Sequence, residues 1–126
     1  MKRGIIALLI VIAVAAFTLY QYFYITSSAD IYIEMLSTAE EQIEQNAITD
    51  AQETVEKLDH RFTLGERTME IFLQHSDVSE IALNIAMLRR YSQTGDISEF
   101  LAVSAVAKRQ LINLSNAQTP CIENIL

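Results

Sequence analysis

The pattern of apolar and polar residues divides the chain into two parts. From Ile5 to Tyr24 the twenty residues are almost all apolar, and no charged residue occurs between Arg3 and Asp30. Because a helix rises about 1.5 Å per residue, a run of this length covers roughly the 30 Å hydrocarbon core of a bilayer. The pattern predicts an N-terminal transmembrane anchor over residues 1–25.

The charges beside this run predict its orientation. Lys2 and Arg3 precede it, and cytoplasmic flanks of membrane spans are enriched in such residues. We therefore expect a single-pass protein of the cell membrane, with a cytoplasmic N-terminus and an extracytoplasmic C-terminal domain. The aromatic cluster within residues 20–24 would then lie at the outer interface, where amphipathic rings are enriched.

A cleaved secretory signal is the alternative interpretation of the same segment. Val14-Ala15-Ala16 resembles the small-residue processing site that follows a short apolar region. The apolar run continues past it to Tyr24, which is longer than a signal peptide requires and favours the anchor. Both interpretations export the rest of the chain.

Beyond the anchor, apolar residues recur every three or four positions, as on one face of a helix. Four such stripes follow one another, and each must be covered by another element. They comprise Tyr32, Leu36, Ala39 and Ile43; Val55, Leu58, Phe62, Met69 and Phe72; Val78, Ile81, Ile85 and Leu88; and Phe100, Val103, Ala107, Leu111 and Leu114.

Start signals accompany the stripes. Ser27, Thr49, Asp77 and Asp96 are each followed three residues later by Asp, Gln or Glu, a spacing typical of helix N-caps. Gly95 suits the left-handed position that ends a helix. We expect connections around residues 46–48, 75–76 and 94–95, short enough to make neighbouring helices antiparallel.

These elements predict an all-α fold, an N-terminal transmembrane helix followed by an antiparallel four-helix bundle over residues 26–118, with a C-terminal tail over residues 119–126. An open array of two helical hairpins is the alternative, but two hairpins bury too little surface to form a solenoid core. Since neither Gly nor Pro occurs between Tyr24 and Gln45, the anchor could join the first bundle helix through Thr26-Ser27-Ser28 as a soft joint or as a continuous rod. Gly65 indicates close approach of a neighbouring helix, a break in the second bundle helix or a functional hinge.

Composition excludes one class of partner. The chain has 16 acidic and nine basic residues; without Lys2 and Arg3, seven bases remain and the exported part carries a net charge of −9. Nucleic acids require clustered Lys and Arg, so we expect no nucleic-acid partner. The acidic stretch from Asp30 to Asp59 is interpreted as a solvated helix surface.

Residues with catalytic potential are sparse. Glu56 and His60 have the four-residue spacing of two metal ligands on one helix face, but further ligands are lacking, and salt pairing or solvation on the helix surface is the favoured interpretation. No hydrolase, phosphate-loop or zinc-protease motif occurs in the sequence. We predict no catalytic, metal or cofactor site and no enzymatic activity. The paired bases at residues 89–90 and 108–109 suit helix C-termini or an acidic partner.

The tail supplies the candidate contact residues. Cys121 is the only cysteine, so in an oxidising compartment it is a free thiol or links two copies of the chain. Ile122, Asn124, Ile125 and Leu126 form an apolar end that should dock on the bundle or on a partner.

The Lys-Arg start, the single span, the acidic helices, residues 73–75 followed by Glu80-Ile81, and the terminal Glu-Asn-Ile-Leu resemble the bacterial membrane proteins of domain of unknown function 4363. The resemblance extends over nearly the whole chain and implies the same anchor and helical architecture, without an assigned activity. It also implies that His75 and the tail contribute to a common fold or a shared partner. The expected function is a tethered protein-binding or accessory module for another membrane or envelope protein; a small-ligand-sensing bundle is the alternative.

Overall fold

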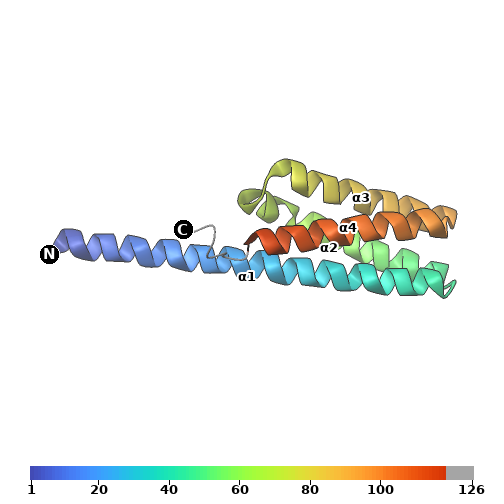
Figure 1. The fold of residues 1–126 in the computed structure, drawn as a ribbon, viewed down its shortest axis with the longest axis horizontal. Helices are drawn as coiled ribbons and strands as arrows, with labels where there is room; N and C mark the ends of the chain where they lie inside the picture. Colours follow the sequence, from blue (N-terminus) through green and yellow to red (C-terminus); the bar gives the residue numbers. More distant parts are fainter. Residues whose placement is uncertain (119–126) are drawn as a thin grey trace.

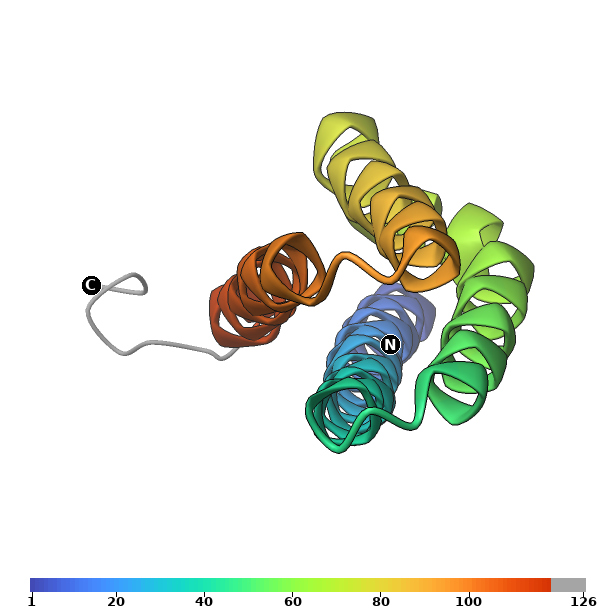
Figure 2. The same ribbon diagram turned by 90° about the vertical axis from the view of Figure 1, so that its right-hand side faces the viewer.

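The computed structural model describes residues 1–118, which form four helices and no strand. They are α1 (Lys2–Glu44), α2 (Ile48–Phe72), α3 (His75–Thr94) and α4 (Ile97–Gln118). α1 packs on α2 and α4, and α3 packs on the same two helices, so the four occupy the corners of a square (Figure 2). This arrangement confirms the all-α, antiparallel four-helix bundle.

The anchor and the first bundle helix are one element. α1 runs for 43 residues without interruption, and its N-terminal half extends well beyond the bundle (Figure 1). The soft joint at Thr26-Ser27-Ser28 and the helix start at Ser27 are therefore wrong. Serine and threonine are tolerated inside a helix where their hydroxyls can bond the preceding turn, as Thr38 does to the Glu34 carbonyl at 3.0 Å.

The predicted stripes form the core. All four residues of the first and third stripes are buried, and Val103 and Phe72 are the half-buried members of the other two. The core also extends further down α1 than predicted, because Ile25 and Ala29 are at most 1% exposed. The boundary placed between residues 25 and 26 thus falls within a helix that belongs to both parts.

Only some of the predicted helix caps form. Gly95 ends α3 with φ of 74°, and the Glu99 N–H donates to Asp96 Oδ1 at 3.4 Å, which confirms that cap. The caps at Thr49 and Asp77 are wrong: α2 and α3 begin at Ile48 and His75 without a side-chain cap. Asp77 lies in the first turn of α3, where a carboxylate favours the helix dipole.

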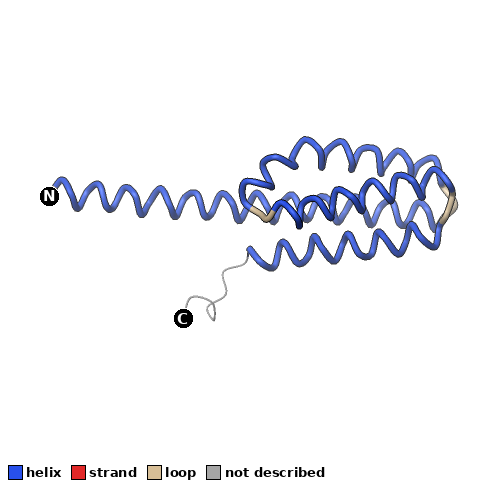
Figure 3. Tube along the Cα trace, turned by 90° about the horizontal axis from the view of Figure 1, so that it is seen from above, coloured by secondary structure: helices blue, strands red, loops and turns tan. Residues whose placement is uncertain are grey.

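The connections determine which helix ends lie beside the projecting part of α1. α1–α2 and α3–α4 turn at the far end of the bundle, whereas α2–α3 turns at the end from which α1 extends (Figure 3). The α2–α3 connection is Leu73–Gln74, two residues before the predicted position, so His75 and Ser76 belong to α3.

Candidate functional site

The most distinctive region is the end of the bundle that surrounds the projecting part of α1. Residues 2–20 of α1 are exposed, whereas Ile25, Ala29 and Tyr32 are buried against the other helices. Among the described residues, α1 is the one helix long and apolar enough to cross a membrane, with a mean hydropathy of 2.3 over its most apolar 18 residues, none of them buried. By length and composition it could be a membrane anchor or a signal sequence.

Aromatic rings join this projecting segment to the base of the bundle. Phe72, the last residue of α2, lies 5.5 Å from Phe17, 6.3 Å from Tyr20 and 6.1 Å from Tyr24, measured between ring centroids. We call these four rings the basal cluster. The sequence placed the tyrosines near a membrane interface but assigned Phe72 only to the core. Helical periodicity does not show which residues of a neighbouring helix lie beside a given side chain.

Gly65 marks a close contact between α2 and α1. A Cβ atom at this position would lie 3.0 Å from Tyr32 Oη and 3.3 Å from Tyr24 Oη. α2 continues through Gly65, so the break is wrong and close approach accounts for the glycine. Burial raises the pKa of the Tyr32 phenol, and the neighbouring Tyr24 raises it further against the opposing effect of Arg61.

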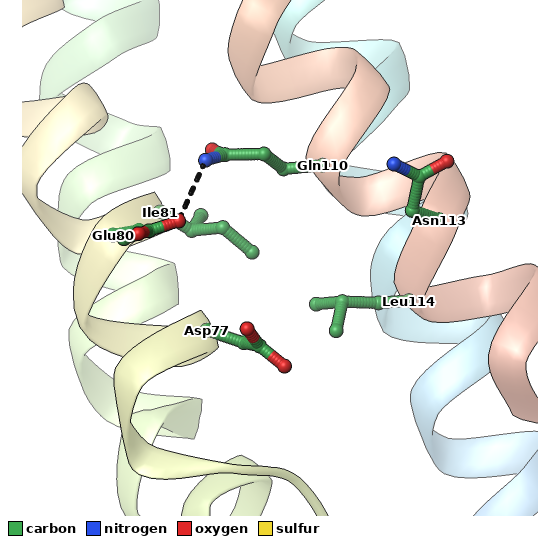
Figure 4. Close-up of a pocket in the computed structure, with 6 residues that line it drawn as sticks. All are labelled: Asp77, Glu80, Ile81, Gln110, Asn113 and Leu114. Atoms are coloured by element: carbon green, nitrogen blue, oxygen red, sulfur yellow. Dashed lines mark hydrogen bonds between the residues drawn. The ribbon is translucent and has the colours of Figure 1, made fainter.

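A hollow of about 270 Å³ lies between α3 and α4 (Figure 4). Gln110 connects its walls: its Nε2 donates to Glu80 Oε2 at 3.3 Å, and its Oε1 accepts from Asn84 Nδ2 at 2.7 Å. Ile81 and Leu114 form the apolar part, and the Asp77 carboxylate borders the opening. Both carboxylates of this hollow are exposed, so they can accept hydrogen bonds from a small polar molecule but are not desolvated.

The histidines lie apart. His75, at the base, has Nδ1 3.0 Å from Glu70 Oε1 and Nε2 3.3 Å from Ser79 Oγ. His60 lies on α2, twelve residues before Phe72, and borders a second hollow with Met35 and Leu64. Residues 1–118 contain no group of three or more side chains placed to hold a metal ion. Glu56, which the sequence placed one helical turn from His60, forms an ion pair with Arg89. The distance between Glu56 Oε1 and Arg89 Nε is 2.7 Å.

The paired bases connect helices to one another. Arg89 on α3 also approaches Asp59 Oδ2 on α2 at 3.6 Å. Lys108 on α4 donates to Glu40 Oε2 on α1 at 2.8 Å, and the two side chains are only 27% and 18% exposed. The acidic partners of Arg89 and Lys108 are thus residues of the bundle itself. The positions of these bases along their own helices could not identify those partners. The remaining candidate contacts, Cys121, Ile122, Asn124, Ile125 and Leu126, lie outside the described residues.

Comparison with known proteins gives one family. The model of the family described as Domain of unknown function (DUF4363) matches residues 19–125. The match begins at Leu19, so it covers the bundle together with most of the basal cluster and leaves out most of the apolar run. No curated protein and no solved structure gave a significant match.

Proposed function

The chain belongs to the family of domain of unknown function 4363, and on that premise we propose that it is a single-pass protein of the bacterial cell membrane. Its bundle acts on the extracytoplasmic side as a binding or accessory module for another membrane or envelope protein. The proposal assigns it no catalytic step.

The observation that carries this proposal is the change of environment along α1. Between Ile5 and Leu19, ten large apolar side chains are each 55–64% exposed. Removing the exposed part of each from water contributes on the order of 1 kcal/mol, so together they approach the whole stability of a domain, about 5–15 kcal/mol. A bilayer covers such a surface without any partner protein.

The shape of α1 supports a tether that fixes orientation as well as position. Because the helix is continuous from Lys2 to Glu44, no flexible linker separates the span from the bundle. Confinement to the membrane surface raises the effective concentration of the bundle towards membrane-bound partners. Lys2 and Arg3 support a cytoplasmic N-terminus.

Two further candidates compete with the tether. Cleavage after Ala16 would leave the whole basal cluster and bundle in place, because Phe17 and every later packing residue follow that bond. The intact mass of the membrane-bound protein distinguishes this case from an anchor. The hollow between α3 and α4 favours small-ligand sensing, but two helices rather than the bundle interior line it, and it is open to solvent.

Cysteine labelling tests the proposed topology. The variant Cys121→Ser with Asp50→Cys has a single thiol at the far end of the bundle, since Asp50 is exposed in the first turn of α2. We expect a membrane-impermeant maleimide to label it in intact cells. A matched chain with its only cysteine in a tag before Met1 should react only after lysis. Recovery of the full chain in the soluble fraction, or labelling at position 50 only after lysis, would refute the proposal.

Crosslinking in membranes tests the partner. The full chain and a chain ending at Gln118 are compared after equal membrane insertion has been verified. We expect the full chain to capture a membrane or envelope protein and the shortened chain to lose it, since the removed segment contains the predicted apolar contacts. Equal capture by both chains would exclude the tail as the contact.

A further inference from the structure

The projecting part of α1 is shorter than its apolar run. The first ring of α1 that contacts another helix is Phe17, at 5.5 Å from Phe72. From Gly4 to Ala16 there are thirteen residues, which span about 20 Å of helix. The hydrocarbon core of a bilayer is about 30 Å thick, so it extends roughly 10 Å past this level, and tilting the helix would lengthen the shortfall.

The base of the bundle occupies the same level. Phe72 contacts Phe17, Tyr20 and Tyr24, which are the residues that the last 10 Å of a bilayer would surround. Figure 1 shows the α2–α3 turn at the end of the bundle from which α1 projects. A membrane around the apolar run of α1 therefore reaches this turn.

The residues of the turn suit such an environment. Ile71 is 74% exposed, and Phe72 and Leu73, which follow it, are half-buried. Glu70 and His75 flank the apolar residues in the sequence, and their side chains lie 3.0 Å apart, between Glu70 Oε1 and His75 Nδ1. This pairing limits insertion to a shallow depth.

We propose that the end of α2 and the turn after it form a second membrane contact, in which Ile71, Phe72 and Leu73 enter the interfacial layer of the leaflet beside α1. The occupant of this apolar surface is phospholipid. A single helix leaves the bundle free to tilt towards any of its sides, and a second contact on the neighbouring helix fixes the side on which the bundle approaches the membrane. This inference rests on the proposed membrane anchor.

Tryptophan fluorescence tests the contact in the full chain, which contains no tryptophan of its own. Ile71→Trp places a reporter in the turn. Leu64→Trp is the matched control, because Leu64 is 72% exposed on the same helix seven residues earlier, two turns and about 10 Å farther from the membrane. Both variants are reconstituted in phosphatidylcholine vesicles, with or without lipids brominated near the headgroup end of the acyl chain. Circular dichroism verifies that both fold.

We expect the Ile71→Trp emission to be blue-shifted and to lose intensity with brominated lipid, and the Leu64→Trp emission to do neither. Equal quenching of the two variants, or no quenching of Ile71→Trp, would overturn the inference. A blue shift that depends on protein concentration and not on bromine would instead indicate a second copy of the chain, and would also overturn it. Flotation separates this failure from that of the anchor: a chain that does not float with the vesicles refutes the proposed function itself.

Discussion

Replacing Gly65 with alanine measures the contact between α2 and α1. In a helix interior the substitution alone stabilises by about 1 kcal/mol, because alanine loses less backbone entropy on folding than glycine. Against this gain, the new Cβ atom would lie 3.0 Å from Tyr32 Oη and 3.3 Å from Tyr24 Oη. The balance between these two effects determines the sign of the change.

The two tyrosines differ in their freedom to move. Tyr24 is half-buried and can shift its ring, but Tyr32 is 3% exposed and packs edge-on against Phe62 at 5.4 Å between centroids. Overpacking of a well-filled site costs about 1–3 kcal/mol. We therefore expect Gly65→Ala to be destabilising by about 1 kcal/mol net, since the cost at Tyr32 exceeds the helix propensity gain.

A double-mutant cycle with Tyr32→Phe isolates the contact. Removing the Tyr32 hydroxyl removes the nearer of the two obstructing atoms, so Gly65→Ala should become neutral or stabilising in that background. The measurement is guanidinium unfolding of the full chain in a mild detergent, followed by far-ultraviolet circular dichroism. If Gly65→Ala stabilises the unaltered chain by about 1 kcal/mol, or changes stability equally in both backgrounds, the close approach does not explain the glycine.

Three further predictions concern the bundle and use the same unfolding assay. Phe62→Ala should cost about 3–5 kcal/mol, because the side chain is 1% exposed and its removal leaves a cavity; a loss below about 1 kcal/mol would contradict the packing. In a double-mutant cycle, Glu40→Gln and Lys108→Met should show a coupling free energy of about 1 kcal/mol. Lys57→Met, which removes an exposed ion pair within α2, should change the free energy of unfolding by less than about 0.5 kcal/mol. The free energy of unfolding should fall as the pH rises above 10.0, the usual pKa of tyrosine. The cause is the raised pKa of Tyr32, because the folded chain keeps the phenol proton to a higher pH than the unfolded chain does. Tyr32→Phe should reduce this fall, and an unchanged pH profile would exclude Tyr32 as its source.

Helical periodicity was sufficient to predict the interior of the bundle. Each predicted stripe contributes residues that are at most 1% exposed, for example Leu36 on α1, Leu58 on α2, Ile85 on α3 and Leu111 on α4. Periodicity works here because each helix has one apolar stripe and short connections restrict its neighbours. The predicted stripe begins only at Tyr32, with Ile25 assigned to the anchor, because within an uncharged run a core stripe cannot be distinguished from a lipid-facing surface.

Contacts that depend on the axial position of one helix relative to another could not be predicted from the sequence. The contact of Phe72 with Tyr20 and the ion pair of Lys108 with Glu40 join residues 52 and 68 positions apart, and the sequence does not give the axial shift between the helices that carry them. Local capping patterns were ambiguous for a different reason. Asp96 directly follows Gly95, which has positive φ, and this is the cap that forms. The helices expected to begin at Thr49 and Asp77 instead begin one and two residues earlier, at Ile48 and His75.

If α1 is the proposed membrane anchor, its continuity determines what the membrane can impose on the bundle. Ile25, Ala29 and Tyr32 are core residues that lie within fifteen residues of Phe17 on the same helix. In a helix, rotation of the segment in the bilayer turns these side chains by the same angle, because every residue is fixed to its neighbours by backbone hydrogen bonds. Close-packed cores resist such rotation, so the bundle either turns with the span as one body or repacks as a whole. The aromatic contacts of Phe72 with α1 favour the first outcome, since they hold α2 to the helix at the point where the two parts meet.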